Sequence, residues 1–332
     1  MSLFVRFRKK PVDLQLLDAV IPRLPPNYQS VLPRLKNAAS RLQKGYAGEK
    51  KLDYHLHQLS KNFTVIPDVT LRWKQQPFQM DSLVISPHAI HIISVKSLEG
   101  SITFDLQQRI LIQESRGHVQ RYECPITQVE RHKAFLMKWF DQQKLIRRPI
   151  YYWIAIAETA TQIKVNPSTE KIPPYIDYVE NIPYKIEQME ANNKHHHPLD
   201  TSVIAYQTKM IVNHTEDFQT NLLKKYKIKL ADLRKGVLCR TCYRLETIYR
   251  YGKIHCKNCG RVPTADILAT LDQFMLLHKI STIKNEQIMH WLQINNRHQT
   301  LRLIKNIGLQ KVPNCRKWQL ENIDKKSLAK VE

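Results

Sequence analysis

The 332-residue sequence contains no apolar run of the ~18 residues that a membrane-spanning helix requires. Its first residues, MSLFVRFRKKPVD, are basic, but they lack the apolar core and the small-residue cleavage site of an export signal. These two absences argue against an integral membrane protein and against a secreted one. We therefore expect a cytoplasmic chain that does not bind a membrane.

Acidic residues are scarce relative to basic ones. The sequence has 29 Asp and Glu against 52 Lys and Arg, which gives a net charge of +23. From residue 224 to the end, 23 Lys and Arg face 8 Asp and Glu, so this third carries +15 of that charge. Such an excess predicts a polyanionic partner. That partner could be nucleic acid or an anionic membrane surface. We favour nucleic acid, and DNA over RNA. The sequence does not indicate an oligomeric state.

Cysteine is also scarce, and four of the six cysteines form two CxxC pairs separated by thirteen residues: Cys239 with Cys242, and Cys256 with Cys259. Each CxxC turn can point two sulfurs at one ion, so two turns complete a tetrahedral zinc site. A redox dithiol would account for one pair but not for both. We predict a structural zinc ribbon whose folding draws about 10–16 kcal/mol from zinc binding. Its four protein ligands leave no position for catalysis.

The pattern of apolar residues predicts an α/β fold for the first half of the chain. Leu52, Leu56 and Leu59 recur at helical spacing, and Pro125 suits the first position of a helix. Short runs rich in β-branched residues predict strands. The predicted helices are 45–59 and 125–140, and the predicted strands are 63–66, 69–73, 80–86, 89–95, 101–106, 109–113, 151–157 and 203–207. A mixed sheet flanked by helices accommodates this order.

The C-terminal region predicts three further helices, which start near residues 264, 285 and 296. Asn296 with Gln299 three residues later is a capping-box arrangement for the last of them. The set resembles a helix-turn-helix, in which one helix enters the DNA major groove. The residues of that helix predicted to contact nucleic acid are Arg297, His298, Gln299, Arg302 and Lys305. The alternative is a small helical bundle that only packs or dimerises.

These features divide the chain into six predicted parts. We expect no chemistry from the N-terminal arm, which is the first of them. The parts are an N-terminal arm (1–40), an α/β domain (41–165), an extension with a basic linker (166–235), the zinc ribbon (236–262), the three-helix module (263–312) and a basic tail (313–332).

The stretch FQMDSLVISPHAIHIISVK places Asp81 at the start of one predicted strand and Lys96 at the end of the next. An acid and a lysine near the ends of adjacent strands are one way to hold a divalent metal beside a phosphate. Such sites usually have a second acid two residues before the lysine, where this sequence has Ser94. A neutral hydroxyl is a poor substitute for a carboxylate toward a hard cation.

Four ordered blocks, GYAGE, FQMDSLVIS, IISVKSLEG and CPITQVERHKAFL, resemble the NERD (nuclease-related) domain of the PD-(D/E)xK nuclease superfamily. The resemblance covers about residues 41–157 and implies a restriction-endonuclease-like mixed sheet. It implies a catalytic set at Glu49, Asp81, the acid position occupied by Ser94, Lys96 and Gln128. Asp81 would bind magnesium or manganese, Glu49 would support it, Lys96 would polarise water or phosphate, and Gln128 would position the substrate.

Two alternatives concern individual residues. Glu99 lies beyond the end of the second strand and could supply the missing acid. Alternatively, Asp81 and Lys96 form only a partly buried ion pair, and Gln128 satisfies backbone groups.

Three functions remain open at this stage. The first is a magnesium-dependent phosphodiesterase that acts on nucleic acid with a degenerate active site. The second, favoured by Ser94, is a non-catalytic DNA-binding or scaffolding protein with a decayed nuclease fold. The third is an adaptor whose basic surface meets an acidic protein partner.

Overall fold

The computed structural model describes residues 3–195, 197–216 and 220–320, which divide into two compact units. The described parts of Met1–Pro11 and Arg41–Phe218 form the first unit, and those of Val12–Ser40 and Gln219–Glu332 form the second. The last twelve residues of the predicted basic tail, 321–332, lie outside the described residues. No helix in the described ranges is both long enough and apolar enough to cross a membrane.

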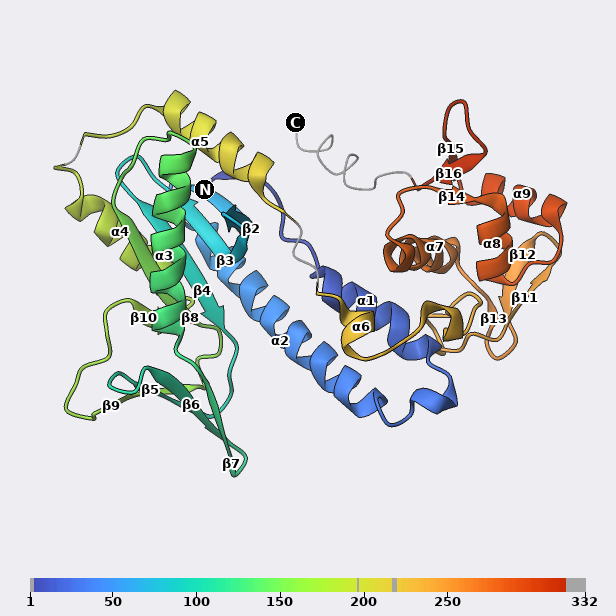
Figure 1. Cartoon of the computed structure of the whole chain (residues 1–332), viewed down its shortest axis with the longest axis horizontal. Coiled ribbons are helices and arrows are strands. Elements are labelled where there is room, and N and C mark those ends of the chain that lie inside the picture. The colour runs from blue at the N-terminus through green and yellow to red at the C-terminus, as the bar shows by residue number, and fades with distance from the viewer. Residues whose placement is uncertain (1–2, 196, 217–219, 321–332) are drawn as a thin grey trace. The chain divides into compact units, whose positions relative to one another are not determined.

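The first unit is built on a six-stranded mixed sheet with the order β1-β2-β3-β4-β8-β10 (Figure 1). β2, β3 and β4 form an antiparallel meander, whereas β8 runs parallel to β4, β10 parallel to β8, and β1 parallel to β2. The strands are β1 (Leu3–Phe4), β2 (Thr64–Trp73), β3 (Gln76–Ile85), β4 (Ile90–Lys96), β8 (Ile150–Ile156) and β10 (Ile176–Tyr178).

Helices cover both faces of this sheet because its strands are apolar on both sides. Side chains alternate between the faces, so Val84 and Ile93 join one core cluster while Leu83 and Ile92 join another. The first cluster includes side chains of α2 and α4, and the second includes side chains of α3 and α5. These helices are α2 (Leu32–Leu56), α3 (Pro125–Gln142), α4 (Ile182–Asn192) and α5 (Thr201–His214).

A smaller four-stranded sheet, ordered β7-β6-β5-β9, completes the first unit. β5 (Ser101–Asp105) and β6 (Ile110–Ser115) form the predicted hairpin. β9 (Gln162–Asn166) runs parallel to β5, and β7 (His118–Glu123) extends the hairpin. We did not predict β7, all of whose residues are exposed, because it has no apolar alternation to reveal it.

The predicted α/β class is confirmed, with three errors in detail. The strands predicted at 63–66 and 69–73 are one continuous strand, β2. Residues 203–207 were predicted as a strand but belong to α5, whose buried positions Ile204, Thr208 and Ile211 recur at helical spacing. The helix predicted at 45–59 is α2, which begins at Leu32, so the predicted arm contains the start of α2 as well as the short helix α1 (Val12–Val20).

The second unit joins a β-hairpin module to three helices. β11 (Thr247–Arg250), β12 (Lys253–Cys256) and β13 (Gly260–Arg261) form one small antiparallel sheet. The helices are α7 (Thr264–His278), α8 (Asn285–Leu292) and α9 (Arg297–Asn306), and a four-residue helix, α6 (Leu222–Lys225), precedes the hairpin module in the chain.

A second small sheet accompanies the three helices and was not predicted. Its strands are β14 (Ile283–Lys284), β15 (Gln310–Lys311) and β16 (Lys317–Gln319), in the order β14-β16-β15. β14 lies between α7 and α8 in the chain, while β15 and β16 follow α9. Strands of two or three residues are too short for a period-2 pattern to be recognised in sequence.

Candidate functional site

Polar residues lie side by side where β2, β3 and β4 meet. Asp68 of β2 and Asp81 of β3 lie opposite each other, between two residue pairs of the β2–β3 ladder. The residue after Asp81, Ser82, pairs with Ile93 of β4. Asp81 therefore lies across from Ser94 of β4, and the Ser94 hydroxyl donates to Asp81 Oδ2 over 3.3 Å. The structure thus brings together the two positions that we expected to share a face.

One oxygen of the Asp81 carboxylate is already engaged by the backbone. The N–H of Val95 donates to Asp81 Oδ2 over 2.7 Å, in addition to the bond from Ser94. Both bonds tie the end of β4 to β3 just beyond their last paired residues. Asp81 therefore holds the strands together as well as presenting a negative charge.

Lys96 lies beside Gln128, the other residue of the implied catalytic set that is not an acid position. Its Nζ donates to Gln128 Oε1 over 3.0 Å, from the end of β4 to the first turn of α3. Within residues 3–195 the structure contains no ion pair between Lys96 and Asp81, so the ion-pair alternative is wrong. The half-buried ammonium has further N–H groups with which to donate to an anion.

His132 lies one turn after Gln128 on α3, and sequence reasoning missed it. The side chain is buried, and burial lowers its pKa to about 4, although the Asp81 carboxylate opposes this shift and the Lys96 ammonium adds to it. His132 is therefore neutral at physiological pH. Its spacing of four residues from Gln128, which places both on one helix face, was the signal that could have found it.

Gly48 allows α2 to approach the end of the sheet and so positions the next residue, Glu49. A Cβ added at Gly48 would lie 2.0 Å from Ser97 Oγ and 2.8 Å from the Ala157 Cβ. Real Cβ atoms do not come so close, so a larger residue would push α2 away. Glu49 is thereby brought to the acidic row on β2 and β3.

The dominant feature of the site is Arg8, which sequence reasoning assigned to an arm without chemistry. Its side chain is only 2% exposed. Nη1 donates to Glu49 (3.0 Å) and to Asp68 (2.6 Å), and Nε donates to Asp53 (2.8 Å). One guanidinium thus joins three carboxylates that come from α2 and β2.

The remaining donors of Arg8 are also satisfied. Nη2 donates to Asp53 Oδ1 (3.0 Å), to the Asp81 carbonyl oxygen (2.8 Å) and to Ser82 Oγ (2.7 Å). A guanidinium offers five N–H donors, and here every nitrogen is bonded. Nearby, Arg6 Nε donates to the Pro67 carbonyl (2.8 Å), so the strand-like N-terminal segment is anchored along β2.

Burial is the largest cause of a raised pKa at two of these acids, Glu49 and Asp68, and the charge of neighbouring acids adds to it. Burial, followed by the charge of Asp81, raises the pKa of Glu49 to about 8, although Arg8 opposes the shift. Burial likewise raises the pKa of Asp68. We call Glu49, Asp53, Asp68 and Asp81 the carboxylate cluster. Within it, Glu49 and Asp68 hold their protons to higher pH than ordinary carboxylates do.

A divalent metal does not fit the carboxylate cluster as it is arranged. Mg²⁺ needs near-octahedral oxygen ligands at about 2.0–2.1 Å. Glu49 is bonded to Arg8, Asp81 Oδ2 is bonded to Val95 and Ser94, and position 94 offers no charge. Among the described residues, the only group of three or more His, Cys, Asp or Glu ligands close enough for one ion is the set of four cysteines.

Glu99 does not replace the missing acid. Its carboxylate accepts from Lys44 over 2.6 Å and pairs with Arg116 over 3.4 Å. All three side chains are largely exposed, and the hydrogen bond from Lys44 lowers the pKa of Glu99. Glu99 thus belongs to a surface ion-pair network.

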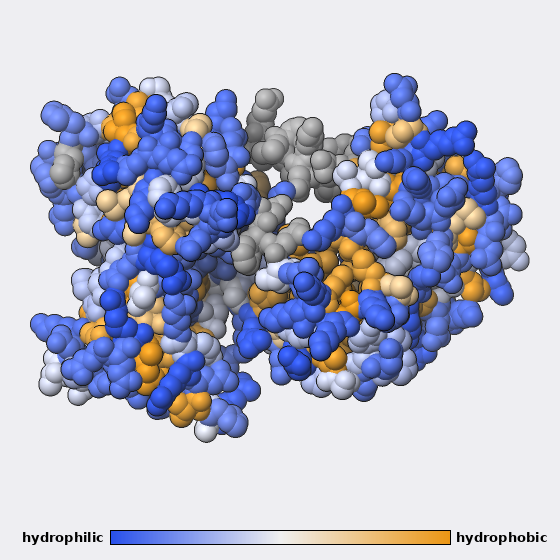
Figure 2. Space-filling model, viewed as in Figure 1, coloured by the Kyte–Doolittle hydropathy of each residue, from blue (hydrophilic) through white to orange (hydrophobic). Residues whose placement is uncertain are grey.

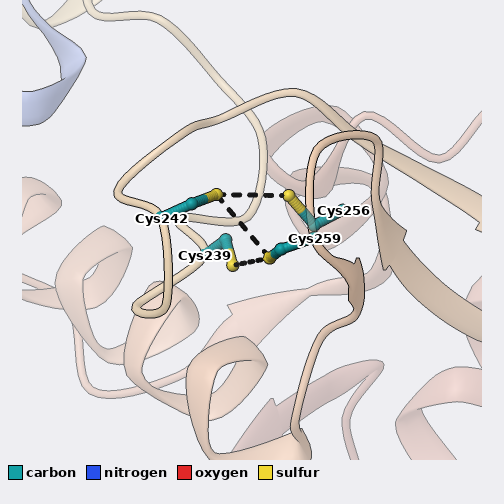
Figure 3. Close-up of side chains that lie close together, drawn as sticks. All are labelled: Cys239, Cys242, Cys256 and Cys259. Carbon is teal, nitrogen blue, oxygen red and sulfur yellow. Dashed lines mark hydrogen bonds between the residues drawn. The ribbon is translucent and has the colours of Figure 1, made fainter.

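The four cysteines converge as predicted (Figure 3). The Sγ atoms of Cys239 and Cys259 lie 3.3 Å apart, those of Cys242 and Cys256 3.5 Å, and those of Cys242 and Cys259 3.7 Å. A tetrahedral zinc with Zn–S bonds of about 2.3 Å separates its sulfurs by about 3.8 Å. All four sulfurs lie within 4.8 Å of one another, so the cluster is consistent with a zinc ribbon.

The predicted nucleic-acid contacts are all exposed on α9. They are Arg297, His298, Gln299, Arg302 and Lys305. The N-cap half of the predicted capping box is confirmed, because Asn296 Oδ1 accepts from the N–H groups of His298 (2.8 Å) and Gln299 (3.1 Å). The helices and their cap are therefore established, whereas their role in binding stays a prediction.

Comparison with protein families gives one match. Residues 44–157 match the family model of the nuclease-related domain, NERD. The match covers α2 from residue 44 through β8, and so contains the carboxylate cluster, Lys96 and Gln128, but not Arg8 or the cysteines. No curated protein and no solved structure matches the chain.

Proposed function

Because residues 44–157 are a nuclease-related domain, we propose that this protein binds nucleic acid, DNA in the first place, and holds it without hydrolysing it. The net charge of +23 supports a polyanionic partner. Lys96 would meet a phosphate group by charge, and the Gln128 amide beside it would donate a hydrogen bond.

The position of Arg8 is the observation that supports binding without hydrolysis. Its guanidinium bonds the carboxylate of Glu49, which the resemblance assigns to support the metal, and the carbonyl oxygen of Asp81, which the resemblance assigns as the metal ligand. A permanently charged group cannot activate water, because it offers no open coordination position and cannot give up its proton. Ser94 supports the same conclusion, since it removes one of the two negative charges that the resemblance implies.

A second candidate, a phosphodiesterase dependent on magnesium or manganese, is favoured by one observation. Asp81, Lys96 and Gln128 remain on neighbouring elements, with Lys96 bonded to Gln128. In that candidate Asp81 would bind the metal, Glu49 would support it, and Lys96 would stabilise charge on the phosphate. Arg8 would first have to leave the carboxylate cluster.

A cleavage assay separates the two candidates. Supercoiled plasmid and linear DNA are incubated with the full chain in Mg²⁺, Mn²⁺ or EDTA, and each mixture is analysed for both cutting and mobility shift. We expect a shift without cutting under all three conditions. Metal-dependent cutting that disappears in Asp81→Ala and in Lys96→Ala would establish the phosphodiesterase. Absence of any shift with DNA, and with RNA incubated under the same conditions, would leave the acidic protein partner as the remaining function.

A second experiment asks what disables the site. Ser94→Glu returns the missing acid, and Arg8→Ala removes the resident cation. We expect Ser94→Glu alone not to bind Mn²⁺ in calorimetry and the double variant to bind it, because only the double variant has both the charge and the space. If Ser94→Glu alone binds Mn²⁺ and cuts DNA, Arg8 is not the obstacle.

A further inference from the structure

We call residues 237–262, which contain the four clustered cysteines and the β11–β12 hairpin, the cysteine module. Its hairpin lies against α9, so the predicted zinc ribbon and the predicted three-helix module share one surface. A Cβ added at Gly252, in the turn between β11 and β12, would lie 4.0 Å from Cδ of Arg302 and 4.0 Å from the Tyr249 hydroxyl. Figure 1 likewise shows β11 and β12 beside α9. The hairpin tip therefore adjoins the predicted nucleic-acid contacts.

Hydrogen bonds from both backbone and side-chain groups join the start of the cysteine module to α7 and α8, and α8 to α7. The N–H of Arg240, inside the first CxxC turn, donates to Asp266 Oδ2 in the first turn of α7 (3.0 Å). The N–H of Gly236 donates to the carbonyl of Trp291 in α8 (2.8 Å), and the Trp291 indole donates to the carbonyl of Thr270 in α7 (3.2 Å). The cysteine module is thus connected to α7 within its first CxxC turn, and to α8 through Gly236, just before its first cysteine.

The exposed face of α9 is basic. Thr300, Leu303 and Ile304 are buried, and helical geometry places His298, Arg302 and Lys305 on the opposite face, at positions i, i+4 and i+7. Within the described residues neither Arg302 nor Lys305 forms an ion pair with an acid. Arg297 and Gln299, which we had grouped with them, lie at the edges of this face.

The hairpin tip adds two more basic residues and an aromatic one. Arg250 and Lys253 pair at the end of the β11–β12 ladder, and both are exposed. Tyr251 between them is 97% exposed. The corresponding region of Figure 2 is largely hydrophilic. We call the exposed face of α9 and this hairpin tip together the tip–helix surface.

Tyr251 is an unfavourable choice for the stability of its turn. Tyr251 and Gly252 both have positive φ, +47° and +76°, in a two-residue hairpin loop. Asn or Asp followed by Gly is the preferred pair in such a turn, and a bulky residue with positive φ is uncommon there. A side chain that is almost wholly exposed gains no packing in return, which points to a use outside the folded chain.

We infer that the tip–helix surface binds a DNA duplex that carries a single-stranded extension. α9 and the basic residues contact the duplex, and the ring of Tyr251 stacks on an unpaired base next to it. A base within a duplex is already stacked on both sides, so an exposed ring at a fixed place selects a base that is free. This inference rests on the proposed function and names the place and the kind of nucleic acid.

Fluorescence anisotropy with three DNA probes tests the inference: a blunt duplex, the same duplex with a single-stranded extension, and the extension alone. The full chain is used at fixed salt. We expect the extended duplex to bind tighter than either of the other probes. Tyr251→Asn, which suits the turn and so preserves it, should lower affinity for the extended duplex by about 5-fold or more, since stacking is worth about 1–3 kcal/mol per base. It should leave the blunt duplex unchanged.

Tyr243→Ala is the matched aromatic control, because Tyr243 is also exposed (75%) in the cysteine module but directly follows Cys242. Zinc content confirms that each variant is folded. If Tyr251→Asn and Tyr243→Ala behave alike, the stacking role is wrong.

Arg302→Ala should weaken binding of both duplex probes and reduce the dependence of log affinity on log salt by about one. Lys224→Ala, on α6, is the matched control for lost charge. Equal effects of the two would place the contact elsewhere and overturn the inference while leaving the proposed function intact. Failure of the unaltered chain to bind any probe would overturn both.

Discussion

The chain contains two groups of side chains that sequence reasoning assigned to metals, and the structure treats them differently. The four cysteines bring their sulfurs within 4.8 Å of one another, and within the described residues no lysine or arginine side chain is bonded to any of these sulfurs. The carboxylate cluster has Arg8 at its centre, bonded to Glu49, Asp53 and Asp68. A set of residues suited to bind a metal therefore predicts a metal site only where no basic side chain of the protein occupies the place of the ion.

The largest expected effect comes from breaking the cysteine cluster. Cys239→Ser removes a buried ligand, so zinc should be lost and the cysteine module should unfold, because about 10–16 kcal/mol of metal binding supports it. Zinc content and hydrogen exchange in residues 237–262 measure this. Cys315→Ser, which lies outside the cluster, should retain one zinc per chain. Slow exchange in 237–262 without zinc would show that the module folds unaided.

Removal of Arg8 tests the other half of the comparison. Arg8→Met should destabilise the first unit by about 3–5 kcal/mol at neutral pH, because it leaves buried carboxylates without their cation. Chemical denaturation followed by hydrogen exchange in α2 and β2 measures it. Arg72→Met, which breaks an exposed pair with Glu216, should have little effect. Equal effects of the two variants would show that the first unit does not depend on Arg8.

Glu49 provides a smaller test that depends on pH. Its pKa is raised to about 8 in the folded chain, against about 4.3 when unfolded. Between these values the folded state binds more protons, so the free energy of unfolding falls as pH rises. Glu49→Gln mimics the protonated form and removes this loss. Its free energy of unfolding should match that of the unaltered chain near pH 4 and exceed it at pH 8 by roughly a few kcal/mol.

Glu216→Gln is the control of opposite sign, because the bond from Arg72 lowers the pKa of Glu216. Unfolding curves measured between pH 4 and pH 9 give both comparisons. Parallel profiles for Glu49→Gln and the unaltered chain would mean that Arg8 fully neutralises the carboxylate cluster.

The smallest expected effect concerns Lys96. Lys96→Met loses one half-buried hydrogen bond to Gln128 and should cost about 1 kcal/mol or less of stability. It should also reduce the salt dependence of DNA binding by about one phosphate contact. Lys138→Met, on an exposed position of α3, should not change that slope. An unchanged slope in Lys96→Met would place the DNA away from the carboxylate cluster.

Much of the fold was predictable because its signals are local. Pro125 begins α3, Asn296 caps α9, and the alternation in β3 and β4 placed Asp81 beside Ser94. The error at residues 203–207 came from five residues that suit a strand as well as a helix. The longer spacing of buried residues over α5 resolves that ambiguity.

The sequence by itself determined the cysteine cluster and the nuclease-related domain, because CxxC spacing and ordered strand motifs operate over short distances along the chain. Only the tertiary structure decided that Arg8 joins the acids of that domain and that the hairpin tip adjoins α9. Arg8 and its partners Glu49, Asp53 and Asp68 lie 41, 45 and 60 residues apart in sequence. No local pattern encodes such a contact, since it depends on where the folded backbone carries each side chain.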